Sequence, residues 1–198
     1  SALPYLVGYL RSLVVKNLMR HGRTFFALLG VEGDGSYMKP IDLYLDLDGV
    51  ILRRTGRTEF GGSTEFEVAP DAMEFLSWAI ENFNCHWLTS RSHDGTYDEI
   101  ERAFRFAISA TSMAVETKDL IRAINPAPWG AEKVSGIDLS RDFYWVDDNP
   151  DSDSVAALDA AGESSRLIIA STDQRPDDLA RVRKLLEDRT MQDCSLQG

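Results

Sequence analysis

An apolar segment that ends in two aspartates constrains this chain more than any other feature of its sequence. The segment IDLYLDLDGVIL, Ile41–Leu52, carries Asp46 and Asp48 into a turn that contains Gly49. Two carboxylates at the end of an apolar strand are unfavourable unless a cation or a reacting group compensates their charge. For one such pair alone, a solvated aspartate next to a helix-capping aspartate is an adequate alternative.

A second acidic pair favours a functional site over this structural alternative. The apolar run Phe143–Val146 ends on Asp147 and Asp148. If both runs are strands of one parallel sheet, their carboxyl ends place four acids around one crevice at the same sheet edge. Four such charges require a divalent cation. Hard oxygen ligands favour Mg²⁺ over zinc, which prefers nitrogen and sulfur ligands.

Strands and helices are predicted to alternate along the chain, which indicates an α/β fold. We expect a three-layer Rossmann-like parallel sheet with helices on both faces. Gly61 and Gly62 divide residues 52–68 into a predicted hairpin over the site. The other predicted strands span residues 41–47, 85–89, 110–116, 143–146 and 166–169. The predicted helices span residues 70–82, 96–107, 120–124, 130–137, 152–161 and 176–189, with a break at 125–129.

Two further residues complete a recognisable order of motifs. Thr89 ends the predicted strand NCHWLT, and Lys133 precedes the second acidic strand. An aspartate pair, a strand-terminal threonine, a lysine and a second aspartate pair, in this order, resemble the haloacid dehalogenase superfamily of phosphohydrolases. The resemblance covers residues 38–170. The two aspartate motifs are specific in combination, whereas Thr89 and Lys133 gain weight from their order.

The resemblance implies a Mg²⁺-dependent phosphatase that works through a covalent intermediate. Asp46 would attack phosphorus and form an aspartyl-phosphate, and Asp48 would act first as general acid and then as general base. Thr89 would donate to a phosphate oxygen, and Lys133 would neutralise both the phosphate and Asp46. Crowding among the carboxylates is one way to keep the required proton on Asp48, while the cation keeps Asp46 ionised.

The ligands of the metal and the phosphate also follow from the resemblance. The implied metal ligands are Asp46, the main-chain carbonyl of Asp48, and one or both of Asp147 and Asp148. The remaining phosphate-binding candidates are Gly49, Ser90 and Arg91, which accompany Thr89 and Lys133.

Several of these residues have ordinary structural alternatives. Taken alone, Lys133 could be a surface lysine, and Lys118 competes with it for the same role. Arg91 could bind a substrate phosphate or be a surface arginine. Asp151 follows the second acidic pair, but we expect it to cap the next helix instead of binding a metal.

The spacing of the motifs leaves little room for a second domain over the site. The segments from Asp48 to Thr89 and from Thr89 to Lys133 are each too short for a cap domain once the expected hairpin and helices are counted. We therefore expect no large cap domain and an open site, which suits a phosphate on a large molecule such as a polynucleotide or a phosphoprotein. A catalytically silent binding or regulatory module is one alternative. A phosphotransferase is another, which is disfavoured because water can reach the aspartyl-phosphate in an open site.

Charge and composition bound the remaining expectations. The 198 residues are 43% hydrophobic, enough for one substantial core, and carry a formal net charge of −11. This charge argues against a broad electrostatic surface for nucleic acid. The two cysteines, Cys85 and Cys194, argue against a disulfide framework and favour a reducing, cytoplasmic location.

The chain is expected to divide into an extension, one domain and a tail. Residues 38–190 form the expected hydrolase-like domain, and residues 191–198 a frayed tail. Residues 1–37 are apolar and basic, with a charge balance of +2 against −13 for the rest. They lack the ~20-residue apolar stretch of a spanning helix. A helix packed on the domain or on a partner, a membrane-surface segment, a targeting segment and an arbitrary start of the chain stay open, as does the oligomeric state.

Overall fold

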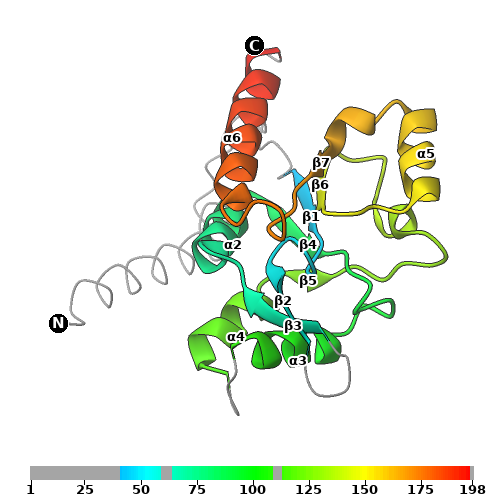
Figure 1. The fold of residues 1–198 in the computed structure, drawn as a ribbon. Helices are drawn as coiled ribbons and strands as arrows, with labels where there is room; N and C mark the ends of the chain where they lie inside the picture. The colour runs from blue at the N-terminus through cyan, green and yellow to red at the C-terminus, as the bar shows by residue number, and fades with distance from the viewer. Residues whose placement is uncertain (1–40, 59–63, 109–112, 197–198) are drawn as a thin grey trace, which may run out of the picture. The chain divides into compact units, whose positions relative to one another are not determined.

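A five-stranded parallel sheet forms the centre of the fold. The computed structural model describes residues 41–58, 64–108 and 113–196, so the expectations for residues 1–37 lie outside the described residues. The strands lie in the order β5–β4–β1–β6–β7, with β1 in the middle (Figure 1). They span Asp42–Leu45 (β1), Asn84–Trp87 (β4), Asn125–Pro126 (β5), Phe143–Asp147 (β6) and Leu167–Ile169 (β7).

Helices pack on both faces of this sheet and give the fold three layers. One face carries α2, α3, α4 and α6, and the opposite face carries α5 and the 3-10 helix η1. The Rossmann-like α/β architecture expected from the sequence is thus confirmed. The helices span Ala72–Asn82 (α2), Asp98–Ala107 (α3), Val115–Arg122 (α4), Lys133–Gly136 (η1), Ser152–Ala161 (α5), Ser164–Arg166 (η2) and Asp178–Leu196 (α6).

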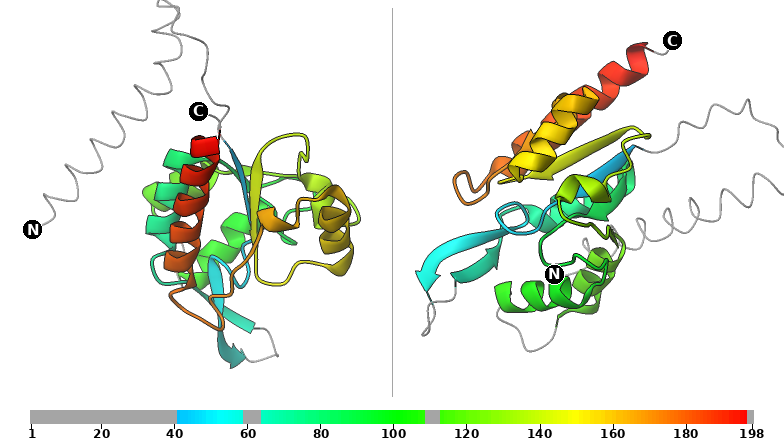
Figure 2. Two further views of the ribbon diagram at one scale, coloured as in Figure 1. Left: turned by 90° about the horizontal axis from the view of Figure 1, so that it is seen from above. Right: turned by 90° about the vertical axis from the view of Figure 1, so that its right-hand side faces the viewer.

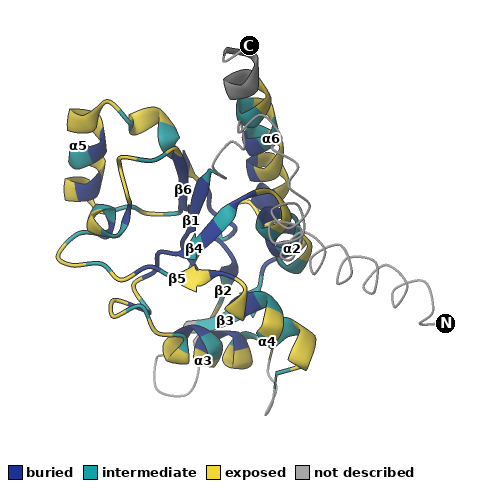
Figure 3. Cartoon of the chain, turned by 180° about the vertical axis from the view of Figure 1, so that it is seen from behind, coloured by how far each residue is buried: buried dark blue, intermediate teal, exposed yellow. Residues whose placement is uncertain are grey.

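The side chains of the central strand are buried on both faces of the sheet. Successive residues of a strand point to opposite faces, so Leu43 and Leu45 enter the core next to α2 and α6, whereas Tyr44 enters the smaller core next to α5. The neighbouring strand β6 is buried at every position. Figure 3 shows the dark blue of these buried strands against the yellow outer faces of the helices. The two strands whose ends carry the acidic pairs are therefore fixed by packing on both sides.

The hairpin predicted after the first acidic pair is present. The antiparallel strands β2 (Leu52–Thr58) and β3 (Thr64–Val68) pair Leu52 with Val68 and Arg54 with Phe66. The hairpin projects from the sheet, as both views in Figure 2 show, and β3 packs against α3. The predicted turn glycines fall within 59–63 and lie outside the described residues.

The strand predicted over 110–116 is wrong in its described part. Residues 113–114 are irregular, and α4 begins at Val115. Val115 is 70% exposed while Ile121 is buried, so the apolar residues follow a helical face and not the alternation of a strand. The strand that does form here is β5, within the segment predicted as a break. Pro126 is tolerated because β5 is an edge strand that pairs with β4 alone.

Three predicted helices differ in extent. The helix predicted over 120–124 is the end of α4, and only Lys133–Gly136 of the segment 130–137 is helical. The last helix continues to Leu196, so the predicted frayed tail is helical from Met191 to Leu196. No glycine or proline interrupts residues 178–196, and nothing in the sequence therefore ends the helix at residue 189.

Shortening a side chain of the central strand tests this packing. Leu45→Ala removes a fully buried side chain, and we expect the free energy of unfolding to fall by about 2–5 kcal/mol. Val115→Ala removes apolar atoms from a 70% exposed position and should change it by no more than about 0.5 kcal/mol. Urea denaturation followed by circular dichroism measures both. Equal losses for the two variants would contradict the placement of β1 at the centre of the core.

Candidate functional site

The two acidic pairs meet at the carboxyl edge of the sheet. β1 and β6 are neighbours, and the N–H of Asp46 donates to the Val146 carbonyl at 2.9 Å. Asp46 directly follows β1, and Asp147 is the last residue of β6. One carboxylate oxygen from each of Asp46, Asp147 and Asp148 lies within 4.8 Å of the other two. Three acids therefore surround one point, as expected when two parallel strands end in aspartates.

Lys133 lies against this acidic group. Its Nζ is 3.0 Å from Asp46 Oδ2 and 2.7 Å from Asp147 Oδ2, and the residue is only 8% exposed. The competing Lys118 lies on α4, where its Nζ pairs with Glu101 at 3.7 Å. The structure thus brings Lys133, and not Lys118, to the two acidic strands.

The start of α5 fixes the position of this lysine. The N–H of Lys133 donates to Asp151 Oδ2 at 3.4 Å, and the N–H of Val134 donates to Ser154 Oγ at 3.0 Å. Asp151 also accepts from the N–H of Ser154 at 2.7 Å, which makes it the N-cap of α5 as predicted. The cap residue therefore stabilises the helix and holds the backbone that carries the lysine.

The acidic group is short of positive charge. Burial, followed by repulsion from Asp147, raises the pKa of Asp46, although Lys133 opposes this shift. Burial and repulsion from Asp147 also raise the pKa of Asp148, against the opposing effect of Arg54. Burial lowers the pKa of Lys133, but Asp46 and Asp147 outweigh it and raise that pKa overall. Asp46, Asp147 and Asp148 present carboxylate oxygens, which are hard ligands of the kind that could hold a metal ion.

Asp147 and Asp148 differ in how they face this site. Asp147 is fully buried, and its oxygens accept from Lys133 Nζ at 2.7 Å and from the N–H of Asn149 at 2.9 Å. The carboxylate of Asp148 lines an open cavity, where Arg54 Nη1 lies 3.5 Å from it. Of the two, Asp148 is therefore better placed to bind an incoming ion directly.

Gly49 makes room for Asp148. The residue has φ of +79°, and a Cβ atom there would lie 2.1 Å from Asp148 Oδ2. The N–H of Gly49 donates to the Leu52 carbonyl at 2.6 Å, and its own carbonyl accepts from the N–H and the hydroxyl of Thr172. The amide predicted to bind phosphate is thus already bonded within the turn, and the close approach of the carboxylate explains the glycine.

Asp48 faces away from the other acids. The Nε–H of Arg91 donates to both carboxylate oxygens of Asp48 at 2.9 Å. Carboxylate crowding, expected from the sequence to act on Asp48, instead acts on Asp46 and Asp148. The guanidinium of Arg91 thus compensates the charge of Asp48.

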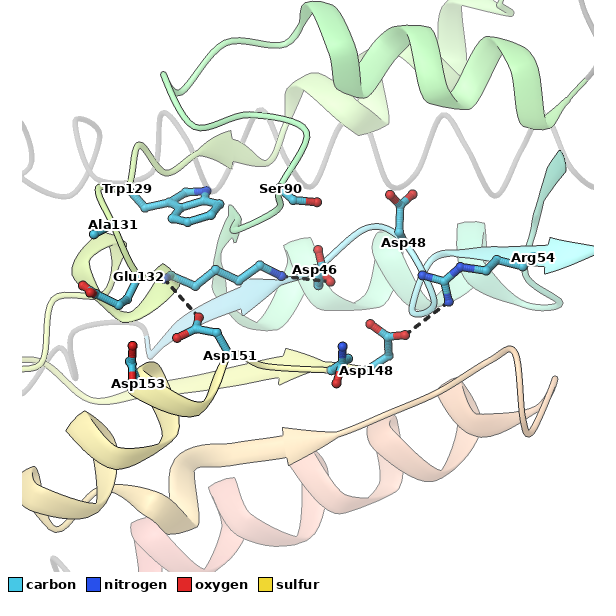
Figure 4. A pocket seen from close by; sticks show the side chains of 12 residues that line it. Asp46, Asp48, Arg54, Ser90, Trp129, Ala131, Glu132, Asp148, Asp151 and Asp153 are labelled. Atoms are coloured by element: carbon cyan, nitrogen blue, oxygen red, sulfur yellow. Dashed lines mark hydrogen bonds and ion pairs between the residues drawn. The ribbon is translucent and has the colours of Figure 1, made fainter. Parts of the chain in front are cut away.

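A cavity of about 390 Å³ opens over these residues, with Asp46, Asp48 and Asp148 toward one end and Trp129 with further acids toward the other (Figure 4). Thr89 is fully buried behind it, and its hydroxyl accepts from the N–H of Arg91 at 3.3 Å. Ser90, the next residue, does line the cavity. The complete lining consists of Asp46, Asp48, Arg54, Ser90, Trp129, Ala131, Glu132, Lys133, Asp148, Asn149, Asp151 and Asp153.

Arg54 and Trp129 were not anticipated from the sequence. Arg54 reaches the site from β2 and is ion-paired with Asp148 and Asp173. Trp129 belongs to the loop after β5, and its Nε1–H donates to the Thr89 carbonyl at 3.0 Å. Neither residue lies in a motif, and both depend on loop and hairpin geometry. In the sequence, only the two consecutive arginines at 53–54, shortly after Asp46 and Asp48, indicated that Arg54 could lie near the site.

Comparison with known proteins adds no family to this geometry. Neither a scan of protein-family models nor a search of curated proteins found a match to the chain. Among the described residues, no helix combines the length and the apolar character that crossing a membrane requires. The site's chemistry therefore has to be inferred from its own residues.

Removing the lysine tests the charge balance of the site. In Lys133→Met two buried carboxylates lose their partner, and without added metal we expect a loss of about 3–5 kcal/mol in the free energy of unfolding. Lys118→Met, which breaks a surface pair, should cost at most about 1 kcal/mol. Urea titrations of both variants at pH 7 measure the difference. Similar losses would mean that Lys133 is not a counter-charge of the buried acids.

Two glycines with the same backbone conformation test the role of Gly49. Gly49→Ala places a methyl group on the Asp148 carboxylate, whereas Gly162→Ala, with φ of +76°, meets nothing within 4 Å. Both should lose about 1 kcal/mol from the strained φ, and Gly49→Ala should lose more because Asp148 has to move away from the methyl group. If Asp148 binds Mg²⁺, only Gly49→Ala should also weaken the rise in melting temperature on addition of Mg²⁺. Thermal melts with and without Mg²⁺ report both effects. A full Mg²⁺ response in Gly49→Ala would contradict the contact.

Proposed function

We propose that this chain is a Mg²⁺-dependent phosphomonoester hydrolase of the haloacid dehalogenase type, which acts through an aspartyl-phosphate on Asp46. The main support is the position of Asp46 at the end of the central strand, 3.0 Å from Lys133 and within 4.8 Å of two further acids. An ordinary core does not concentrate three carboxylates around one lysine, because their desolvation is costly. Phosphoryl transfer requires just such an arrangement of charge.

Asp46 is oriented for attack on phosphorus. Its Oδ1 accepts from the N–H of Leu47 at 2.8 Å and its Oδ2 from Lys133, so the carboxylate is held from two sides. Attack by one oxygen forms the P–O bond to Asp46 while the bond from phosphorus to the leaving oxygen breaks. Lys133 neutralises charge on the phosphate as it transfers. A Mg²⁺ ion held by Asp46 and Asp148, with Asp147 adjacent, would supply further charge stabilisation.

Asp48 supplies and removes the protons. It protonates the leaving oxygen in the first step. In the second step it takes a proton from the water that attacks the phosphorus of the intermediate, while the bond from phosphorus to Asp46 breaks and frees the carboxylate. This role requires that Asp48 exchange its contact with Arg91 for a proton. A substrate phosphate is a competing acceptor for the same guanidinium. We infer that Arg91 moves from Asp48 to the phosphate when substrate binds, which frees Asp48 to carry the proton.

The cavity suggests how substrate enters. One end holds Asp46, Asp48 and Asp148, and Trp129, Ala131 and Glu132 line the other end (Figure 4). Between β1 and β4 the described residues form only the β2–β3 hairpin and α2, with no cap domain among them. An open cavity of this kind accepts a phosphate that is attached to a large molecule.

A binding module without turnover is the second candidate, and one observation favours it. Both oxygens of Asp48 accept from Arg91, so neither is free for a leaving group or a water molecule. A phosphatase assay with p-nitrophenyl phosphate and Mg²⁺ separates the two functions. Turnover supports the enzyme, and binding of phosphate without turnover supports the module.

Substitution of the nucleophile is the sharpest chemical test. Asp46→Asn should lower kcat roughly 10³-fold or more, because the covalent route is deleted. The fold should persist, since the substitution also relieves carboxylate repulsion. Asp48→Asn should be nearly as damaging, and a chelator should silence the wild type until Mg²⁺ is restored. Asp119→Asn, at an exposed position of α4, is the control. Wild-type rates in Asp46→Asn would refute the proposal.

The openness of the site is tested by substrate size. Because no cap excludes a large substrate, kcat/KM for a phosphopeptide or a 5′-phosphorylated oligonucleotide should be no lower than for a small sugar phosphate. Steady-state assays of released phosphate provide the comparison. A strong preference for one small metabolite would show that another element closes over the cavity.

A further inference from the structure

The hairpin carries an aromatic ring that contacts two arginines of the site. Phe66 lies on β3, directly opposite Arg54 on β2, so their side chains share one face of the hairpin. The Arg54 Cζ lies 5.8 Å from the centre of the Phe66 ring, and the Arg91 Cζ lies 5.1 Å from it. Both distances are within the range of cation–π contacts. One ring therefore holds two guanidinium groups that come from different parts of the chain.

Each of these guanidinium groups compensates one carboxylate of the site. Arg91 donates to both oxygens of Asp48, and Arg54 lies 3.5 Å from Asp148. Asp173, in the loop before α6, also accepts from the backbone N–H and the guanidinium of Arg54. Two like charges gathered on one ring repel each other, so their positions depend on the ring face and on the acids that they meet.

We propose that Phe66 is a positioning residue: it holds Arg91 and Arg54 so that Asp48 and Asp148 keep the geometry the reaction needs. The inference rests on the proposed function and deepens it, because it makes the hairpin part of the catalytic machinery. Phe66 itself contacts no reacting atom and acts through the two arginines. Its ring keeps Arg91 within reach of both Asp48 and an incoming phosphate, and it keeps Arg54 beside Asp148.

The geometry predicts an effect on both kinetic constants. Asp48 acts in the chemical steps and Arg91 also binds the incoming phosphate, so a displaced Arg91 should lower kcat and raise the KM for p-nitrophenyl phosphate. Phe66→Leu keeps an apolar side chain against the neighbouring core but removes the ring. We expect kcat to fall about tenfold, the factor that corresponds to the loss of two cation–π contacts at partly exposed positions. Displacement of Arg54 removes a positive charge from beside Asp148, so it should lower the Mg²⁺ concentration needed for half-maximal activity.

Rescue separates positioning from packing. Phe66→Tyr and Phe66→Trp restore an aromatic face and should recover at least about half of the wild-type kcat, since each ring supports a cation–π contact. Phe106→Leu makes the same change at a 72% exposed position of α3 and should leave kcat unaltered. A fall in kcat that Tyr and Trp do not rescue, or that Phe106→Leu reproduces, would overturn the inference.

A spectroscopic measurement reports the contact without turnover. The Nε–H of Arg91 lies near the Phe66 ring and donates to Asp48, so in wild type its NMR signal should show a ring-current shift and slow exchange with water. Both features should be lost in Phe66→Leu and retained in Phe66→Tyr. Unchanged signals in Phe66→Leu, or an unchanged kcat in an otherwise active enzyme, overturn the inference alone. A wild type that lacks phosphatase activity overturns the proposed function, and the catalytic role of Phe66 with it.

Discussion

The contact of Lys133 with Asp46 and Asp147 is the interaction on which the rest of the site depends. Both carboxylates are buried at the ends of adjacent strands, and Lys133 Nζ lies 3.0 Å and 2.7 Å from their oxygens. Charges in such an environment are tolerated only when they are paired and hydrogen-bonded. The parallel pairing of β1 with β6 brings the acids together, and the cap of α5 holds the backbone of the lysine beside them. The sheet, the 3-10 helix η1 and the N-cap of α5 thus together position one cluster of charges.

On the side of the site that faces the hairpin, two arginines compensate further carboxylates. There Arg91 compensates Asp48, and Arg54 compensates Asp148 and Asp173. Lys133 is buried, whereas Arg54 and Asp48 line the open cavity, where a bound phosphate can attract an arginine. This asymmetry agrees with the proposed mechanism, in which Asp46 is held in place while Asp48 exchanges partners.

Much of this arrangement could be predicted from the sequence, and the reason is physical. A strand of apolar residues that ends in two acids is rare unless the acids have a function, and parallel strands bring their carboxyl ends to one edge. These two facts predict that both acidic pairs meet at one edge. The structure brings Asp46, Asp147 and Asp148 together, whereas Asp48 turns toward Arg91. The order of the motifs favoured Lys133 over Lys118, because Lys133 lies just before the second acidic strand.

The remainder depended on contacts that no local pattern encodes. The partner of Arg91 is set by the path of the loop after β4, and the approach of Arg54 is set by the register of the hairpin. Trp129 reaches Thr89 through a loop whose course follows from β5, a strand of two residues that contains a proline and was predicted as a break. The segment before α4 was predicted as a strand because a short apolar run does not distinguish a strand from a helix.

The central claim is that Asp46 becomes phosphorylated during turnover, and chemical trapping tests it most directly. Rapid mixing of the Mg²⁺-loaded protein with excess phosphate ester, followed by an acid quench and borohydride reduction, converts an aspartyl-phosphate into homoserine. Peptide mass spectrometry then locates the converted residue. The proposed mechanism predicts homoserine at position 46, absent when the ester is omitted. Release of phosphate at the normal rate with Asp46 unmodified throughout would contradict it.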